Sequence, residues 1–182
     1  LVNTLLEVNR YESGNKTLTV TQCNIWEIIQ AVVEELQPLA QYKSISLSAI
    51  SDVPDPQSLK VLSDCQEIRR AITNLVGNGL KFTDVGDVEL KLGFEPAQIE
   101  DAVAMNGWVT IDVRDTGLGM SEQEQQTIFE RFRTGKHRQA GSGLGLHLVA
   151  RIVTTHSGTV TVTSTPGQGS LFKVRLPAHQ SD

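Results

Sequence analysis

The sequence predicts a two-layer α/β sandwich, in which a mixed, mostly antiparallel sheet of about five strands packs on about three helices. Two observations lead to this α+β fold class. Helical and strand patterns intermix along the 182 residues, and neighbouring strand patterns are joined by turns, so hairpins dominate the sheet. A hydrophobic content of 39% and a charged content of 20% are typical of a soluble globular domain with a buried core.

The first half of the chain predicts two helices and three strands. Apolar residues at helical spacing place one helix over Leu1–Glu12. Asn24 can cap a second helix that runs to about Tyr42. Alternation of apolar and polar residues predicts an edge strand and two further strands, over Lys16–Val20, Ile45–Ile50 and Leu59–Leu62.

The second half predicts three helices and four strands. A long helix is expected over Asp64–Phe82, with Glu67 in the capping-box position. Ser121–Glu124 forms a second capping box and begins a short helix, and the last helix spans Leu144–Ser157 with Gly158 after it. Four strand patterns follow, at Gly86–Gly93, Trp108–Arg114, Thr159–Thr165 and Ser170–Leu176. A polar loop joins the first two of them.

Composition argues against several classes of protein. There is no apolar run of 18 residues, so we expect no membrane span and no membrane contact. A net charge of -5 and a pI near 5.4 argue against a nucleic-acid binder. Cys23 and Cys65 match no metal or redox spacing, and we interpret them as buried small apolar residues in a reducing compartment. The histidines form no metal-ligand pair: His137, His147, His156 and His179.

Three polar residues share one face of the Asp64–Phe82 helix. They are spaced i, i+4, i+7: Asn74, Asn78 and Lys81. The opposite side carries Ile72, Leu75 and Val76, which can pack on a sheet. An amide oxygen is a hard, neutral ligand for Mg²⁺, which is usually shared with substrate phosphates, and a lysine supplies charge for phosphate. A solvated helix face is the alternative interpretation.

The segment Arg114–Leu146 holds six of the 15 glycines of the chain. Glycine pairs in DTGLGM and GSGLGL bracket a cationic stretch with Arg131, Arg133, Lys136 and Arg138. Glycine allows a backbone to approach a ligand, and the clustered cations favour an anionic one. We therefore predict a mobile lid over nucleotide phosphates, at about residues 121–142. A solvated surface loop is the competing interpretation.

Other site motifs fit poorly. No P-loop is present, and GSGLGL lacks the last glycine of a dinucleotide-binding fingerprint because Leu146 stands there. The tripeptide Asp115–Gly117 is followed by leucine, where an aspartic protease would carry a small hydroxyl residue. Arg114 breaks a calcium-loop pattern, and Ser142 has no nucleophile elbow.

Four blocks in a fixed order resemble the catalytic ATP-binding domain of sensor histidine kinases, a Bergerat-type fold shared with DNA gyrase and MutL. The N-box is NLVGNGLKFT at Asn74–Thr83, and the first G-box is DTGLGM at Asp115–Met120. The F-box is IFERF at Ile128–Phe132, and the second G-box is GSGLGL at Gly141–Leu146. The resemblance covers about Leu18 to Pro177.

The resemblance implies binding of ATP with Mg²⁺. Asn78 would ligate Mg²⁺, with Asn74 close to the metal and phosphates, and Asp115 would accept a hydrogen bond from the adenine amino group. The first G-box would approach the base, and the second would bring helix amides to the phosphates. The catalytic residues implied are Asn74, Asn78 and Lys81. The remaining ATP-binding residues implied are Phe82, Asp115, Gly117, Gly119, Met120, Phe132, Arg133, Gly141, Ser142, Gly143, Leu144, Gly145, Leu146 and Ser170.

Departures from the family pattern refine the expected activity. Gly79 stands where alanine is usual, and Asn74 stands where gyrase-type ATPases carry the glutamate that activates water. Phosphoryl transfer to a protein side chain is therefore expected in place of fast hydrolysis. None of the histidines lies in an acceptor box, so the chain should not phosphorylate itself.

The resemblance also implies a domain division and partners. Residues 1–15 would be the tail of a helix of the dimerisation hairpin, and residues 16–182 would be the catalytic domain. The acceptor histidine would lie in another part of that hairpin. The expected partners are that hairpin domain, in a homodimer of the full protein, and a response-regulator receiver domain. We expect this domain to lie in the cytoplasm. That location is compatible with membrane anchoring of the full protein. Two alternatives stay open: a regulatory nucleotide-binding module without transfer, and a serine kinase of the anti-sigma-factor type.

Overall fold

The computed structural model describes residues 2–98, 103, 106–133 and 143–179. Its main sheet has five strands in the order β2-β4-β5-β7-β6. Only the β2–β4 pair is parallel within this sheet, and the other neighbours are antiparallel. The strands are β2 (Ser46–Ser51), β4 (Asp87–Glu95), β5 (Trp108–Asp115), β6 (Thr159–Thr165) and β7 (Gly169–Pro177). The mixed, mostly antiparallel sheet is thus confirmed.

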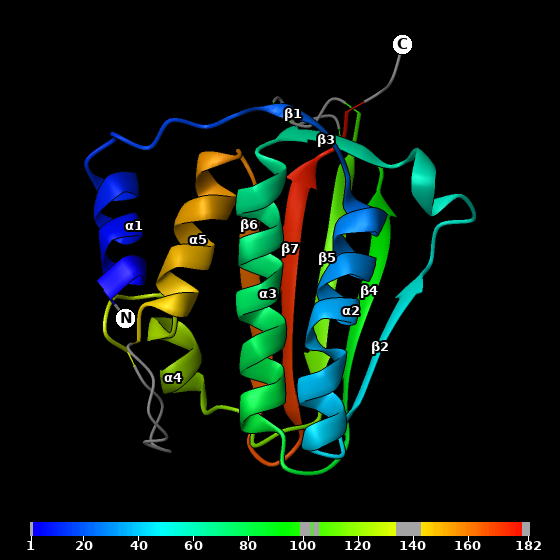
Figure 1. Ribbon diagram of the computed structural model, residues 1–182, viewed down its shortest axis with the longest axis vertical. Coiled ribbons are helices and arrows are strands. Elements are labelled where there is room, and N and C mark those ends of the chain that lie inside the picture. The colour runs from blue at the N-terminus through cyan, green and yellow to red at the C-terminus, as the bar shows by residue number, and fades with distance from the viewer. Residues whose placement is uncertain (1, 99–102, 104–105, 134–142, 180–182) are drawn as a thin grey trace.

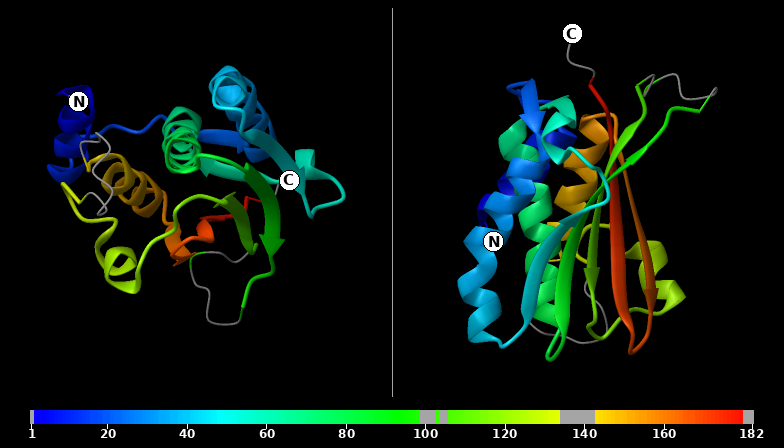
Figure 2. Two further views of the ribbon diagram at one scale, coloured as in Figure 1. Left: turned by 90° about the horizontal axis from the view of Figure 1, so that it is seen from below. Right: turned by 90° about the vertical axis from the view of Figure 1, so that its right-hand side faces the viewer.

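Three helices form the second layer. They are α2 (Ile25–Tyr42), α3 (Cys65–Phe82) and α5 (Gly145–Thr155). All three lie on one face of the main sheet, as Figure 1 and the edge-on view in Figure 2 show. Helix α1 (Val2–Glu12) lies outside this layer against α5. The core between the layers is apolar, so burial of one helix stripe and one sheet face stabilises the arrangement.

Helix α3 shows how the sequence sets this packing. Asp64 caps it, because its Oδ1 accepts hydrogen bonds from the backbone amides of Gln66 and Glu67. The side chain of Glu67 does not return to the cap, so only half of the predicted capping box forms; that carboxylate contacts Tyr11 and Lys16 instead. The predicted inner face, Ile72, Leu75 and Val76, is buried.

The expected edge strand at Lys16–Val20 is wrong. This segment has no strand structure, and β1 (Thr21–Asn24) begins only after it and pairs with β3 (Lys60–Ser63) in a separate two-stranded sheet. The residues of the segment make contacts of another kind. Lys16 forms ion pairs with two glutamates, and the amide of Thr19 donates to Asp64. The alternation does not mark a buried face either, since Leu18 packs against the core but Val20 is 56% exposed.

The interpretation of Cys23 and Cys65 as free residues is also wrong. They form a disulfide, with Cα atoms 5.6 Å apart and a separation of 42 positions in sequence. Antiparallel pairing places Cys23 opposite Val61 on β3, and α3 starts two residues after β3 ends. This tight connection returns Cys65 to Cys23. The disulfide therefore ties the small sheet to the first turn of α3.

Short helix α4 (Glu122–Thr127) is fixed at both of its sides. Its predicted capping box is confirmed, since Ser121 and Glu124 bond reciprocally. Gln125 faces β6, where its Nε2 donates to the carbonyl of Ser164 at 2.9 Å and its Oε1 accepts from the Ser164 amide at 3.0 Å. One carboxamide thus satisfies both backbone groups of an edge-strand residue.

The last helix ends earlier than expected, at Thr155. Ser157 adopts the left-handed conformation, with φ 58°, where the sequence suggested Gly158. Gly158 is needed for space instead, because a Cβ there would lie 2.4 Å from the carbonyl oxygen of Arg175. Within the described ranges, no helix combines the length and the apolar character required to cross a bilayer.

Candidate nucleotide-binding site

A pocket opens between α3, the end of β5, α4 and β7. The empty space among its lining atoms is about 600 Å³, a figure that includes open solvent. Most of the lining is apolar, with few polar groups, as is usual for small-molecule sites. The lining residues are Asn78, Gly79, Phe82, Asp115, Leu118, Gly119, Met120, Glu124, Ile128, Leu146, Ser170 and Phe172. Residues from all four predicted boxes, with Ser170, therefore meet in one pocket.

Asp115 is the buried carboxylate of this pocket. It ends β5 directly opposite Ser170 of β7, and only 7% of its surface is exposed. Burial raises the pKa of Asp115, while hydrogen bonds from the amides of Gly117 and Ser170 oppose this shift. The Gly117 amide donates to Asp115 Oδ1 at 2.9 Å. The pocket thus holds an oriented acceptor, with little access to water, for an N–H donor of a ligand.

Two glycines of the first G-box are required by the packing of the chain on itself. A Cβ at Gly117 would lie 2.4 Å from the carbonyl oxygen of Phe82. At Gly119, where φ is +64°, a Cβ would lie 2.0 Å from the carbonyl oxygen of Thr165. Close approach of backbone segments excludes a side chain at both positions, and at Gly119 the positive φ also favours glycine. The glycines bring the loop after Asp115 against α3 and β6.

The polar end of the site lies where α3 meets the start of α5. Asn74 Nδ2 donates to the carbonyl of Arg70 at 2.9 Å, and a Cβ at Gly145 would lie 3.2 Å from Asn74 Oδ1. Asn78 lines the pocket and also a second, polar groove between α2 and α3. Lys81 Nζ lies 4.9 Å from the ring centroid of Phe82. The carboxamides of Asn74 and Asn78 and the start of α5 therefore lie beside the pocket, while Lys81 lies next to Phe82 at the end of α3.

The F-box residues divide between pocket and surface. Ile128 lines the pocket, and the ring of Phe129 packs edge-on against Phe172 with centroids 6.2 Å apart. Phe132 is 62% exposed, and Arg133 is paired with Glu130 at 2.8 Å, so neither lines the pocket. Their predicted contacts with ATP stay predictions.

The second G-box is only partly described. The predicted residues Gly141 and Ser142, with part of the predicted lid, lie outside the described residues. The amide of Phe132 donates to the carbonyl of Gly143 at 2.9 Å, which joins the two described ends of this segment. Leu144 is buried, and Leu146 lines the pocket.

Sequence reasoning missed five lining residues: Gly79, Leu118, Glu124, Ile128 and Phe172. Gly79 stands where the family pattern has alanine, and a Cβ there would lie 3.2 Å from Val88 Cγ1 and 3.5 Å from Asp115 Cβ. Because Gly79 has no side chain, α3 can lie close to the sheet at this position. The position of Ile128 within the F-box was a usable signal, whereas Phe172 reaches the pocket only through strand pairing.

A family model described as histidine kinase-, DNA gyrase B-, and HSP90-like ATPase matches residues 63–180. Sensor protein EvgS of Escherichia coli (strain K12) is 31% identical over 183 residues, which cover 100% of this chain and 15% of that protein. Sensor histidine kinase TmoS of Ectopseudomonas mendocina is 33% identical, over 97% of this chain and 17% of that protein. The chain therefore spans less than a fifth of the length of these relatives.

Two solved structures extend the comparison. Full-length ShkA in complex with AMPPNP superposes with a TM-score of 0.82 and 29% identity, over 99% of this chain and 35% of that chain. The nucleotide-free catalytic domain of histidine kinase ThkA gives a TM-score of 0.68 and 24% identity, over 87% of this chain and 95% of that chain. The second likeness supports the fold alone.

Proposed function

Because the chain belongs to the family of histidine kinase-, DNA gyrase B- and HSP90-like ATPases, as a catalytic ATP-binding domain of the sensor histidine kinase type, we propose that it transfers the γ-phosphate of ATP to a histidine. The acceptor would lie on a dimerisation hairpin domain that is not contained in these 182 residues. The phosphate would then pass to an aspartate of a response regulator.

The observation that carries this proposal is a pocket lined both by the buried, oriented Asp115 carboxylate and by the Asn78 carboxamide. The Asp115 carboxylate would accept a hydrogen bond from the amino group of adenine, and the ring would be held among Phe82, Met120 and Phe172. Asn78 also lines the pocket, and Asn74 lies about one turn before it on α3, where both would face the phosphates. Lys81 lies beside Phe82 at the end of α3 and would contact phosphate from there. A base at one end and a triphosphate at the other suit this separation of apolar and polar groups.

Asn78 fits the expected magnesium ion chemically. Its amide oxygen is a hard, neutral ligand of the kind that Mg²⁺ takes together with phosphate oxygens and water. When bound, the ion would neutralise charge that develops on the transferring phosphoryl group. The chain's own contribution is positioning: Asn74 and the amides at the start of α5 would orient the phosphates.

Asn74 favours transfer over hydrolysis. Its side chain is a carboxamide already engaged with the Arg70 carbonyl, and it cannot take a proton from water. No described residue that lines the pocket, apart from Asp115 and Glu124, is a carboxylate. Asp115 is held by Gly117 at the base end, and Glu124 is committed to its capping box with Ser121. A protein side chain is therefore the preferred phosphoryl acceptor.

Assignment to a larger protein is part of the same proposal. Residues 1–15 would be the end of a hairpin helix, and residues 16–182 the catalytic domain. The hairpin would make the full protein a homodimer, and the domain would act in the cytoplasm. Its direct partners would be the hairpin domain and a receiver domain.

The test supplies a separately produced hairpin domain from a similar sensor kinase with this chain and ATP radiolabelled at the γ-phosphate. Label on the hairpin that is lost in acid and kept in base identifies phosphohistidine; the opposite stability would identify a serine kinase. ATP binding without any label on an intact hairpin would contradict transfer and favour a regulatory module.

The matched variant is Asn78→Ala. We expect it to abolish labelling and to reduce the gain in ATP affinity that Mg²⁺ provides by at least about tenfold, since a metal ligand is removed. Titration calorimetry with and without MgCl₂ measures this gain. Asp52→Asn, which removes a surface ion pair with Lys91, is the control and should label like the wild type.

A further inference from the structure

Helix α1 is packed as part of the core. Val8 is fully buried and Tyr11 is 5% exposed, and both belong to the main hydrophobic cluster. In Figure 1, α1 runs beside α5 at the side of the molecule that carries α4. An apolar contact of this kind holds a helix in place, while the polar face of the helix can contact other elements.

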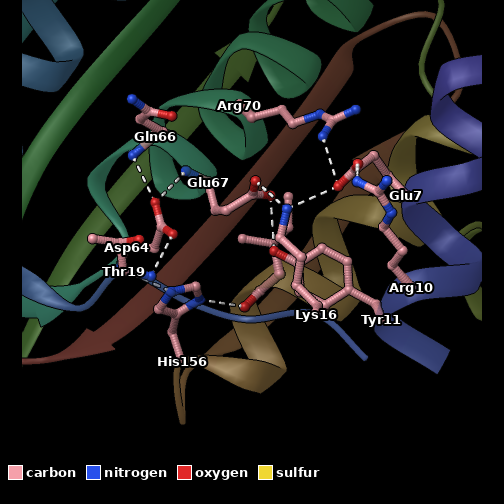
Figure 3. Close-up of polar contacts among 11 residues, drawn as sticks. Glu7, Arg10, Tyr11, Lys16, Thr19, Asp64, Gln66, Glu67, Arg70 and His156 are labelled. Atoms are coloured by element: carbon pink, nitrogen blue, oxygen red, sulfur yellow. Dashed lines mark hydrogen bonds and ion pairs between the residues drawn. The ribbon is translucent and has the colours of Figure 1, made fainter. Parts of the chain in front are cut away.

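A network of buried and half-buried charges fixes the orientation of α1 (Figure 3). The Tyr11 hydroxyl donates to Glu67 Oε2 at 2.8 Å. Lys16 Nζ lies 2.7 Å from Glu67 Oε1 and 2.8 Å from Glu7 Oε2, and Arg70 Nη1 lies 3.3 Å from Glu7 Oε2. Because Glu67 and Arg70 are on α3, this network sets the position of α1 relative to the helix that carries Asn74 and Asn78.

The last residue of α1 reaches the nucleotide pocket through two contacts. Glu12 Oε2 lies 3.0 Å from Arg131 Nη1, and Glu12 Oε1 lies 3.1 Å from His147 Nε2. His147 Nδ1 lies 2.9 Å from the carbonyl oxygen of Phe129. A carbonyl only accepts, so Nδ1 donates there, and Nε2 faces the Glu12 carboxylate.

These contacts hold a segment that we call the rim, residues Ile128 to Phe132. Ile128 lines the pocket, and Phe129 packs on Phe172, which also lines it. His147 directly follows Leu146, another lining residue. Glu12 thus joins the rim and the start of α5, two walls of the pocket, from a helix that does not line the pocket.

We propose that Glu12 is a positioning residue for nucleotide binding: it holds the rim against α5, so the placement of α1 sets how firmly the pocket retains its nucleotide. The inference rests on the proposed role of the pocket as the ATP site. A shift or rotation of α1 would break the contacts with Arg131 and His147 while the body of the domain stays folded.

The experiment is a charge-swap cycle on the full chain. It uses Glu12→Arg, Arg131→Glu and the double variant, with dissociation of an ATP analogue carrying a fluorescent ribose label followed by stopped flow. The Glu12 and Arg131 side chains are 31% and 35% exposed. For pairs of that exposure we expect each single variant to speed dissociation about two- to five-fold. The double variant restores the pair with residue 131 but not the contact with His147, so it should release the analogue no faster than either single variant.

Melting temperatures of all variants are measured alongside. A role in stability alone predicts lower melting temperatures with unchanged dissociation rates, whereas positioning through this pair predicts faster dissociation in the single variants that is not additive in the double variant. Single variants that match the wild type, or a double variant that releases the analogue faster than either single variant, would overturn the inference. Asp52→Asn breaks another surface ion pair, at 2.9 Å from Lys91, and should leave the rate unchanged.

The outcome also separates this inference from the ATP site itself. If the wild-type chain fails to bind the analogue, the proposed function and the role of Glu12 both fail. If the wild type binds it and the cycle shows no coupling between Glu12 and Arg131, only the role of Glu12 fails.

Discussion

Reduction of the Cys23–Cys65 disulfide should destabilise the domain by a large and calculable amount. The bond spans a separation of 42 positions in sequence. Closing a loop of that length lowers the entropy of the unfolded chain enough to stabilise the fold by about 4 kcal/mol. For a domain of this size the melting temperature should then fall by about 8–16 °C on reduction. Reduction leaves every side chain in place, so it isolates the bond better than a substitution does.

Chemical denaturation with and without a thiol reductant measures this difference. Thiol titration in denaturant should find no free thiol before reduction and both cysteines after it, as the chain has two. The Cys23→Ser/Cys65→Ser variant is the control, because reductant should not change its stability further. If reduced and oxidised wild type unfold at the same denaturant concentration, the inference of a stabilising cross-link is refuted.

ATP binding should be measured in both redox forms, because ATP is an intracellular substrate and thiols in the cytoplasm are kept reduced. The disulfide anchors the first turn of α3, while Asn74 and Asn78 lie two turns or more further along. We expect the reduced domain to bind ATP with the same affinity at temperatures well below its melting point.

Three further predictions concern single residues. Asp115→Asn should weaken ATP binding about 10- to 150-fold in calorimetry, since a hydrogen bond to a charged acceptor is lost. The same change should not lower the melting temperature at neutral pH. Burial raises the pKa of Asp115 above its usual 3.8, so the folded state binds the proton of this carboxyl more tightly than the unfolded state does. The stability that Asp115 contributes is therefore lost as the pH rises from 3.8 through the folded-state pKa. Gly119→Ala should cost more than about 2 kcal/mol in urea unfolding, because a Cβ would lie 2.0 Å from the Thr165 carbonyl at a φ of +64°; unchanged stability would contradict that geometry. Gly77→Ala should instead stabilise the free domain by up to about 1 kcal/mol, because nothing lies within 4 Å of the added carbon; a loss of stability would show that α3 is not regular there.

Most of the fold could be predicted because local signals and tertiary packing agree. In α3, the cap at Asp64 and the apolar stripe through Leu75 both specify the same helix and the same buried face. The Asn74–Asn78–Lys81 face was predictable for the same reason. Where local and tertiary preferences differ, the prediction failed. Lys16–Val20 alternates like a strand, but Lys16 is held by Glu7 and Glu67, and the segment pairs with no strand among the described residues.

Contacts between distant segments were beyond the reach of sequence patterns. The partner of Cys23 depends on the β1–β3 register and on the tight connection into α3, and neither can be deduced from spacing. His147 belongs to no acceptor box in the sequence, and its contact with Glu12 crosses 135 positions of sequence. Phe172 reaches the pocket only because β7 pairs with β5. Each of these depends on the assembled sheet, which one-dimensional periodicity does not specify.

The Gln125–Ser164 contact has a consequence for association between molecules. Strand β6 is at the edge of the main sheet, and outward-facing backbone groups on an edge can recruit a strand from another chain. At Ser164 both of these groups already bond to the carboxamide of Gln125. A side chain thus occupies the place that an invading strand would need, beside the mouth of the pocket. Gln125 therefore hinders the addition of a foreign strand, and so aggregation, at this end of the sheet, and it also anchors α4.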